Sequence, residues 1–439
     1  MLKGVTLLLS FLSLVTSAYA WRLTGITLGT ITNYNTLNYP THFVESDTFS
    51  STWASDGNTY SIADDNIQGW DGQAPPPPNP NGYNASVALL TITGSFPTTA
   101  IIGSLENAMP ILGVTHQNGD TDQGSPPPSS ATWKGFGLMS IAGTLYGFFG
   151  RQPEGGVQYY TDEWTTQIIS CAISSRCTVS SNWTPLPPPG SFPFTSPMWP
   201  LPSTPRISQD GYKLGLFTTP VWVEYGQDYN NLTGTLGGFS LNVDNNTTYA
   251  YAFGSDGYSF NGSNDYLGRV PIAGGATTIQ NAANWQYYCG PIGGNISASI
   301  NWCSPSVISS YPPTGATALF SEPFKVGEVG VQYLPVHGRY IAIFTYYPAA
   351  NQSPPVNKVF NTVWQVYEAG TLTGPWTKIQ TIVWNNQGYY TPYFIPQSIN
   401  TDGGLTGEAL AAGNYLRACP TGCYYTMNMM PITFNYANP

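Results

Sequence analysis

The chain has 439 residues and a formal net charge of −10, from 13 Lys and Arg against 23 Asp and Glu. Nucleic acids, anionic lipid surfaces and polyanionic polysaccharides each need a basic stripe on their partner, so this balance argues against all three. Aromatic residues make up 14% of the chain, which suits flat platforms that stack on the apolar faces of sugars. The composition therefore favours a neutral partner.

Residues 1–20 have the layout of a secretory signal peptide. Lys3 precedes the apolar run "VTLLLSFLSLV", and the segment ends in the small-residue pattern Ala-Tyr-Ala. No later stretch approaches the roughly 20 apolar residues that a membrane helix needs. We therefore expect residues 21–439 to form one exported domain that is not anchored in a membrane.

Short strand-like runs bounded by turn residues recur along the whole chain, and 47 Gly with 38 Pro would interrupt most helices. A unit of strand, Gly-containing turn and strand recurs, and one further segment (366–384) looks like the outer part of another unit. The units span residues 53–64, 139–150, 243–254 and 333–344. Radial repetition limits exposed strand edges. The sequence predicts an all-β, five-bladed β-propeller with long Pro-rich loops, with a two-domain sandwich as the alternative.

The six cysteines form three close pairs, which we expect to be local disulfides in an exported protein. The pairs are Cys171 with Cys177, Cys289 with Cys303, and Cys419 with Cys423. No histidine lies near any pair, so a zinc site is not indicated, and we expect neither a metal nor another cofactor. Asn-x-Ser/Thr triplets recur along the chain, as is typical of a secreted glycoprotein.

Carboxylates concentrate in residues 46–65, "SDTFSSTWASDGNTYSIADD". Asp-Gly between alternating apolar residues predicts a hairpin turn, and a turn centred on Asp56 places Asp47 opposite Asp65. Like charges so paired are destabilising unless solvent screens them or one carboxyl keeps its proton, the arrangement that acid–base chemistry uses. The alternative is that these are turn-forming aspartates, and the same Ser-Asp-Gly turn at Asp256 supports that alternative.

Other candidate site residues are scattered. A carboxyl group among apolar neighbours has a raised pKa if it is buried. Such a group is more often a structural hydrogen-bond acceptor than an acid catalyst. Asp64 is a register alternative to Asp65. The catalytic or pKa-tuning candidates are Asp64, Glu224 and Glu328, and the candidate substrate-binding residues are Trp53, Arg151, Tyr225 and Arg269. The two arginines are equally suited to pairing with a channel carboxylate. The motifs of esterases, metalloproteases and nucleotide-binding proteins are absent from the sequence.

The sequence resembles the five-bladed propeller family, formerly a domain of unknown function, that includes bacterial endo-D-arabinanases. The resemblance lies in residues 46–65 and in the segments "GLMSIAGTLYGFF", "TTPVWVEYGQDY" and "GEVGVQYLPVHGRYIAIF", and it extends over most of the mature chain. It implies that Asp47 and Asp65 are the catalytic pair. The turn reads Ala-Ser-Asp-Gly where the family tends to have two adjacent acids, and shared fold does not transfer substrate.

These observations lead us to expect a secreted, monomeric glycoside hydrolase that acts on a neutral polysaccharide or glycan, with an arabinan as one option. A lectin-like propeller that binds glycans without cleaving them is the alternative, and it would place similar sugar pockets in several blades. A polysaccharide lyase is disfavoured, because uronate substrates require basic residues that this chain scarcely has.

Overall fold

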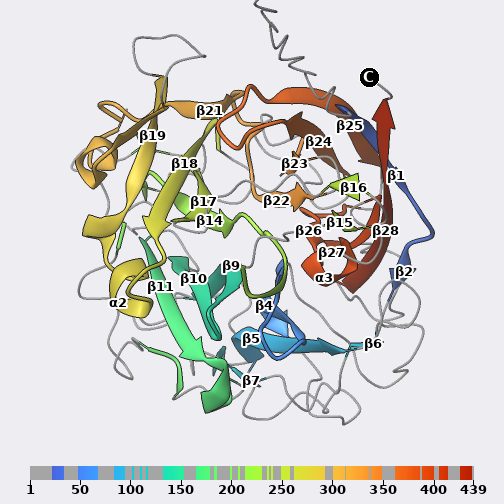
Figure 1. The fold of residues 1–439 in the computed structure, drawn as a ribbon, viewed down its shortest axis with the longest axis horizontal. Coiled ribbons are helices and arrows are strands. Elements are labelled where there is room, and N and C mark those ends of the chain that lie inside the picture. Colours follow the sequence, from blue (N-terminus) through green and yellow to red (C-terminus); the bar gives the residue numbers. More distant parts are fainter. Residues whose placement is uncertain are drawn as a thin grey trace, which may run out of the picture.

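The computed structural model shows a five-bladed β-propeller, in which five antiparallel sheets are arranged radially (Figure 1). This confirms the predicted fold class. The structure describes residues 22–33, 48–67, 84–93, 101–102, 109–110, 115–116, 132–152, 165–177, 182–184, 198–199, 206–207, 213–229, 235–236, 239–240, 249–257, 262–291, 300–311, 313–335, 338–348, 361–385, 388–399, 405–413 and 426–437.

The first two blades each begin with a hairpin that the sequence predicts. The first blade consists of β3 (Thr48–Trp53), β4 (Thr59–Ile67) and β5 (Asn84–Thr93), and β5 also pairs with the short strands β6 (Ile101–Ile102), β7 (Met109–Pro110) and β8 (Thr115–His116). The second blade consists of β9 (Thr132–Ile141), β10 (Thr144–Gln152) and β11 (Thr165–Ala172). The units expected at 53–64 and 139–150 are therefore confirmed as blade hairpins.

The third and fourth blades depart from two expectations. The third consists of β14 (Thr218–Trp222), β17 (Tyr249–Ser255), β18 (Asn264–Pro271), β19 (Gln286–Pro291) and β20 (Ile300–Cys303), with β21 (Ala318–Ser321) beside β18. The fourth consists of β22 (Val329–Leu334), β23 (Arg339–Tyr346), β24 (Asn361–Ala369) and β25 (Thr377–Asn385). The expectation that residues 243–254 form a local hairpin was wrong, because β17 pairs with β14, which lies far from it in the sequence. Residues 366–384 belong to the same blade as residues 333–344, not to another.

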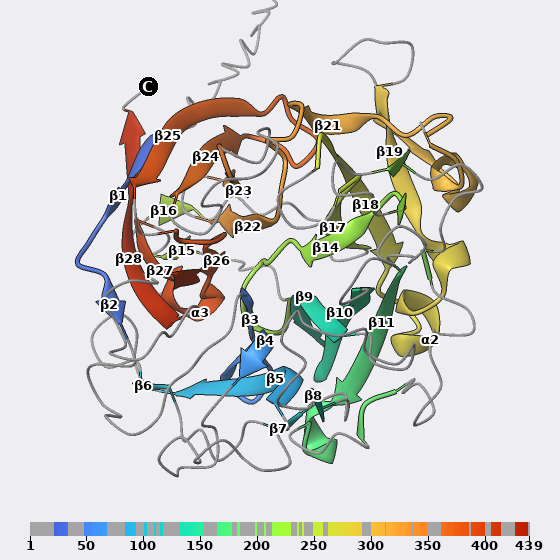
Figure 2. The same cartoon turned by 180° about the vertical axis from the view of Figure 1, so that it is seen from behind.

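The fifth blade joins the two ends of the described chain. Its strands are β26 (Tyr393–Phe394), β27 (Thr406–Gly413), β28 (Thr426–Ala437) and β1 (Arg22–Leu28), with β2 (Thr32–Asn33) also on β28. The pairing of β1 with β28 is visible from both sides of the propeller (Figures 1 and 2). The outer strand of the last blade is thus supplied by the beginning of the chain.

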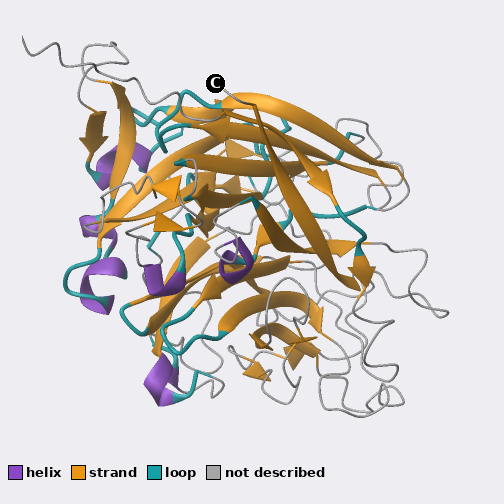
Figure 3. Cartoon of the chain, turned by 45° about the vertical axis from the view of Figure 1, so that its right-hand side comes forward, coloured by secondary structure: helices purple, strands orange, loops and turns teal. Residues whose placement is uncertain are grey.

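The remaining elements are short. Two small ribbons pair β12 (Arg206–Ile207) with β13 (Lys213–Leu214) and β15 (Thr235–Leu236) with β16 (Phe239–Ser240). The helices are α2 (Ala276–Ile279), α3 (Pro396–Ile399) and the 3-10 turns η3 (Ile173–Ser175), η5 (Gln227–Tyr229), η6 (Ala282–Asn284) and η8 (Pro305–Ile308). Figure 3 shows how strands dominate the described chain. None of its helices has the length and apolar character that crossing a membrane requires.

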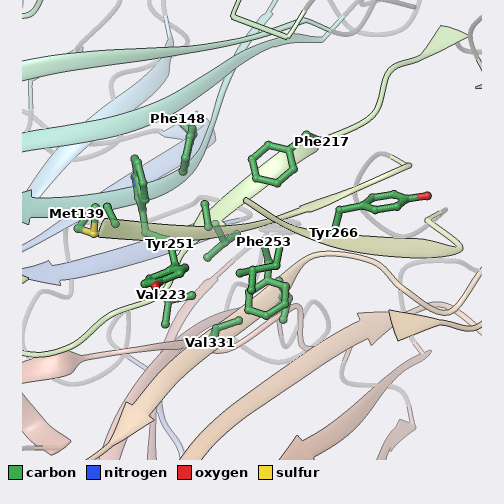
Figure 4. Packing of buried hydrophobic residues seen from close by; sticks show 14 of the residues in the cluster. Met139, Phe148, Phe217, Val223, Tyr251, Phe253, Tyr266 and Val331 are labelled. Atoms are coloured by element: carbon green, nitrogen blue, oxygen red, sulfur yellow. The ribbon is translucent and has the colours of Figure 1, made fainter. Parts of the chain in front are cut away.

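Hydrophobic packing between blades is mainly aromatic. The largest buried cluster joins the second, third and fourth blades, and Figure 4 shows part of it. Phe217 is fully buried and lies over the glycines Gly254 and Gly268, where a Cβ atom would come within 2.5 Å and 2.8 Å of its ring. Trp285 packs at the edge of the same ring, 5.8 Å from its centroid. The Gly-rich strands therefore make room for large rings between the sheets.

Two of the three predicted disulfides are present. Cys171 is bonded to Cys177 and Cys289 to Cys303. The first bridge ties the end of β11 to the turn that follows it, and the second joins β19 to β20.

The third predicted pair consists of Cys419 and Cys423. Both residues lie outside the described part of the chain, in the segment between β27 and β28. A disulfide that joins Cys419 to Cys423 therefore stays a prediction from their spacing.

An ion cluster fastens the closing strand to the neighbouring blade. Glu368 of β24 is 3% exposed and lies between two arginines. Arg339 Nη2 is 2.7 Å from Glu368 Oε2, and Arg22 Nε of β1 is 2.9 Å from Oε1. The side chain of Gln380 on β25 also accepts a hydrogen bond of 2.7 Å from the backbone N–H of Ile26. Side chains of the fourth blade therefore hold β1 in place.

We expect Arg339→Met and Arg22→Met to differ strongly in stability. The side chain of Arg339 is 15% exposed and that of Arg22 is 55% exposed. Removing the buried partner leaves Glu368 poorly compensated and should lower the free energy of unfolding by about 3 kcal/mol. Removing the exposed partner should cost about 1 kcal/mol or less. Urea unfolding of both variants measures the difference, and equal losses would contradict the assignment.

Candidate functional site at the propeller axis

The innermost strands of the five blades surround the axis and run in one direction. β3, β9, β14, β22 and β26 contact one another in turn and close a ring. Leu138 N donates to Ser50 Oγ at 2.9 Å and Ser140 N to Thr52 Oγ1 at 3.0 Å, so β3 and β9 advance together. We call the end of the axis where these strands begin the start face, and the opposite end the finish face.

The hairpin of the first blade has the predicted register. Thr48 pairs with Asp64 and Trp53 pairs with Thr59, and the register is unbroken between these two pairs. On its other side β4 has a bulge, where the pairing with β5 shifts between Asp64 and Ile67. Asp47 and the side chains of Asp64 and Asp65 lie outside the described residues. The backbone of Asp64 and Asp65 lies at the start face.

Two further candidates lie at this same face. Glu328 directly precedes β22 and is 4% exposed. Its backbone oxygen accepts hydrogen bonds from Thr391 Oγ1 at 2.9 Å and from Thr345 N at 3.2 Å. Arg151 pairs with Trp133 near the beginning of β9, although its side chain lies outside the described residues. The start face therefore groups Glu328 and Arg151 with the backbone of the acidic hairpin.

The other candidates lie towards the finish face. Trp53 is the last residue of β3, and Glu224 and Tyr225 follow β14. Glu224 contacts β3 at Thr52, which is four residues beyond Thr48 and hence about 13 Å along the strand. The two carboxyl groups of a glycoside hydrolase stand about 5–5.5 Å or 6.5–9.5 Å apart. The structure thus divides the predicted set between two ends.

Tyr225 has aromatic neighbours on several sides. It is 5% exposed, and its hydroxyl lies 3.1 Å from that of Tyr340. Its ring also packs against Tyr229 and Tyr333, with centroids 5.1 Å and 5.4 Å away. This placement gives Tyr225 a packing role between the third and fourth blades.

Arg269 lies in β18, the middle strand of the third blade and not its innermost one. Its Nε and Nη2 donate to Gln286 Oε1 at 2.9 Å and 2.8 Å. The guanidinium is stacked between the rings of Tyr249 and Trp302, 4.1 Å and 4.0 Å from their centroids. Its observed partners are an amide and two aromatic rings, an arrangement that suits the planar guanidinium.

A polar cluster of buried side chains lies between the inner strands, towards the finish face. We call it the axis plug, and it consists of Thr52, Ser140, Glu224 and Gln332 from four different blades. Thr52 Oγ1 accepts from Ser140 N and donates to Glu224 Oε2 at 3.3 Å. Glu224 pairs with Gln332 through an isolated parallel bridge, and Gln332 Nε2 donates to Glu224 O at 3.3 Å.

Glu224 has an unusual environment for a carboxyl group. The residue is 5% exposed, and its Oε1 has no hydrogen-bond partner. Burial raises the pKa of Glu224 well above its ordinary value, and the hydrogen bond from Thr52 opposes this only in part. A neutral, protonated carboxyl is the form that this environment favours.

Asp228 connects the axis plug to the second blade. Its Oδ1 accepts from Ser140 Oγ at 2.7 Å and from Gly143 N at 3.0 Å. Asp228 has φ +50, a left-handed conformation that aspartate tolerates better than most residues. No local sequence pattern singles out Asp228, Thr52, Ser140 or Gln332, because their contacts join different blades.

Two aspartates have the turn role that the alternative interpretation gave them. Asp56 accepts from Asn58 N at 3.0 Å and from Tyr60 OH at 2.8 Å. Asp256 accepts from Ser263 N at 2.8 Å and Asn264 N at 3.0 Å. Among the residues that the structure describes, no three His, Cys, Asp or Glu side chains gather as metal ligands would.

We expect Thr52→Val to destabilise the protein more than Ser51→Ala. Valine has nearly the same shape but leaves both Ser140 N–H and Glu224 Oε2 without a partner, at about 1–3 kcal/mol for each buried group. Ser51 Oγ donates only within its own strand, to Phe49 O at 3.1 Å. Urea unfolding of the two variants compares the losses, and similar losses would show that the axis plug contributes no more than an ordinary strand hydroxyl.

Comparisons with known proteins give distant structural likenesses. No protein-family model matches the chain. No curated protein matches it either. An α-L-arabinofuranosidase from Lactobacillus brevis aligns with TM-score 0.44 and 12% identity, over 92% of this chain and 95% of that one. A glycoside hydrolase family 43 arabinoxylan arabinofuranohydrolase from Bacillus subtilis aligns with TM-score 0.38 and 14% identity, over 93% and 68%. Trypanosoma rangeli sialidase aligns with TM-score 0.39 and 9% identity, over 92% and 59%. None of these comparisons assigns the chain to a family.

Proposed function

We propose that this protein is a secreted glycoside hydrolase that cleaves a neutral polysaccharide or glycan at the start face of the propeller. Asp47 and Asp65 form its catalytic pair, one as general acid and the other as nucleophile or base. An arabinan-type furanose polymer is the substrate class that the sequence resemblance implies. The observation that supports the proposal most directly is the register of the β3–β4 hairpin, which pairs Thr48 with Asp64.

The register supports the pair because residues 47 and 65 are the next positions outward. Directly opposed cross-strand residues have Cβ atoms about 4.5–5.5 Å apart, which is close to the carboxyl separation of retaining enzymes. The bulge beyond Asp64 also matters. Bulges re-aim side chains and are over-represented next to active sites, so the bulge is a means of directing Asp65 towards a substrate.

Glu328 has a supporting role in this proposal. It lies at the start face and is almost fully buried. A carboxyl group beside the catalytic pair is the kind of neighbour that tunes the pKa of a general acid. The low content of basic residues and the aromatic richness of the chain agree with a neutral sugar substrate.

Asp47→Asn and Asp65→Asn should each reduce hydrolysis by at least about 100-fold, because positioned proton transfer contributes roughly 10²–10⁴-fold. Release of reducing ends from a panel of neutral plant, fungal and bacterial polysaccharides measures the activity. Binding of the cleaved polysaccharide should persist in both variants. Undiminished turnover in both would remove the assignment to this pair.

Asp56→Asn is the matched control, because Asp56 belongs to the same hairpin but lies exposed at its turn. It should leave turnover unchanged. Asp64→Asn tests the register alternative, since neighbouring strand residues point to opposite faces of the sheet. Glycan binding by the unaltered chain without any release of reducing ends would favour the lectin-like alternative.

A further inference from the structure

Three buried carboxyl groups combine an oxygen that has no hydrogen-bond partner with a raised pKa. They are Glu224 Oε1 in the axis plug, Asp265 Oδ2 in β18 and Glu408 Oε2 in β27. The three residues are 5%, 1% and 2% exposed. An isolated charge in such a position costs several kcal/mol unless it is paired. A buried carboxyl group without donors is therefore best accommodated in its neutral form.

Other buried carboxylates in the same chain are fully supplied with donors. Asp256 is 0% exposed and accepts from two backbone N–H groups and from Asn264 Nδ2. Glu368 is 3% exposed and lies between Arg22 and Arg339. The fold thus provides donors or cations where a carboxylate is to stay charged. Glu224 accepts a hydrogen bond from Thr52 and Asp265 accepts one from the backbone of Tyr266, but one oxygen of each of Glu224, Asp265 and Glu408 has no partner.

The groups that face Glu224 are neutral. β3 contributes Thr52, β22 contributes Gln332, and η5 contributes the hydroxyl-bearing Tyr229, whose pKa the charge of Glu224 would raise further. Gln332 Oε1 also lacks a donor. Glu224 and Gln332 are bridge partners, so two side chains that each carry an unpaired acceptor oxygen start from paired positions of neighbouring blades.

Asp265 faces a like charge. It lies opposite Ser255 of β17 and Phe320 of β21. Burial raises the pKa of Asp265 well above its ordinary value, and the nearby carboxylate of Asp256 raises it further. Asp256 accepts hydrogen bonds from Ser263 N, Asn264 N and Asn264 Nδ2, whereas Asp265 Oδ2 has no partner, so Asp265 is the member of this pair that a proton suits.

Glu408 is anchored through its backbone but not through its carboxyl group. Its N–H donates to Ser398 Oγ at 2.8 Å, and its carbonyl accepts from Ile395 N at 2.8 Å. Pro431 of β28 lies opposite. Burial raises the pKa of Glu408 to about 7. No Lys, Arg or His among the described residues contributes to the pKa shift of any of the three carboxyl groups.

We propose that this propeller is built to work in acidic surroundings, with protons on Glu224, Asp265 and Glu408 stabilising the axis plug and the third and fifth blades. Loss of these protons at neutral to alkaline pH leaves uncompensated charges inside the fold and loosens it. The inference concerns stability, so it stands or falls independently of the proposed hydrolysis.

The direction of the pH dependence follows from linkage. A carboxyl group with a raised pKa holds its proton in the folded chain at pH values where the unfolded chain has lost it. Its stabilising effect is complete below the unfolded pKa and decreases as pH rises through the folded pKa. For Glu408 this window runs from about 4.5 to about 7. For Glu224 and Asp265, whose pKa values are raised well above the ordinary ones, it extends to higher pH.

The test is urea unfolding of the full chain from pH 5 to pH 8, followed by tryptophan fluorescence. The unfolding equilibrium constant of the unaltered chain should rise with pH, by up to about tenfold per pH unit for each proton that only the folded chain holds. Glu224→Gln, Asp265→Asn and Glu408→Gln should each flatten the rise. The triple variant should be nearly independent of pH and more stable than the unaltered chain at pH 8.

Glu322→Gln is the matched control. Burial alone would raise the pKa of Glu322, but hydrogen bonds from Tyr367, Lys378 and Gln365 outweigh it and lower the pKa. Its stabilising effect is therefore present above its unfolded pKa and lost as pH falls. The control should leave the rise between pH 5 and pH 8 in place. Stability that is flat or increases with pH in the unaltered chain would overturn the proposal.

Two measurements on the unaltered chain test the proposal even if the variants do not fold. An infrared carbonyl band of protonated carboxyl groups should persist at pH 6 and fade towards pH 8, and its absence at pH 6 would overturn the proposal. Unfolding at pH 8 with calcium chloride or with a chelator tests whether a cation occupies these oxygens instead. Unchanged stability supports the protons, whereas strong stabilisation by calcium that Glu224→Gln abolishes would overturn their assignment to Glu224.

Discussion

The inner strands of this propeller meet at an axis where neighbouring blades share almost no backbone ladder, and their polar groups must be satisfied in other ways. Side-chain hydroxyls do so on β3, where alternate residues Thr48, Ser50 and Thr52 reach Gly135, Leu138 and Ser140 of β9. Because side chains alternate along a strand, every second residue faces the neighbouring blade. The alternation of side chains along β3 therefore places the hydroxyls of every second residue against β9 and joins the first and second blades.

Elsewhere around the ring, close approach of the backbones joins neighbouring blades. A Cβ at Gly137 would lie 3.0 Å from Pro220 O, and one at Gly330 would collide with Pro392 O. Between the third and fourth blades, Tyr333 N and Gln332 Nε2 both donate to Glu224 O. The start face and the finish face differ in the side chains that they carry. The axis plug lies towards the finish face, and the open end of the acidic hairpin of the first blade lies at the start face.

Local signals in the sequence were sufficient for the first, second and fourth blade hairpins. The Asp-Gly turn at Asp56 fixed the register of β3 and β4, because a tight turn allows little choice of pairing. Local signals could not predict the pairing in the third blade, because a long segment separates β14 from β17 in the sequence. The fifth blade could not be seen locally either, because β1 and β28 lie at opposite ends of the described chain. Strand order depends on packing between distant segments, which periodicity does not encode.

The candidate site shows the same limit. Sequence reasoning singled out Glu224 and Glu328 for their apolar neighbours, and both are buried. It could not show that they lie towards opposite ends of the axis, because that follows from the common direction of the inner strands. The burial of Glu408 in a short Gly- and Ala-rich strand gave no signal at all, since nothing in "TGEALAAG" distinguishes an exposed from an enclosed carboxyl group.

The position of β1 has a consequence for biosynthesis. Ile26 pairs with Phe434, so β1 gains its ladder partner only when β28, from the other end of the described chain, folds against it. Contacts this distant in sequence slow folding, and a solitary strand offers free edges to other chains in the meantime. Before β1 joins the fifth blade, the ion cluster at Glu368 lacks Arg22. Assistance with folding would have the greatest effect at that stage.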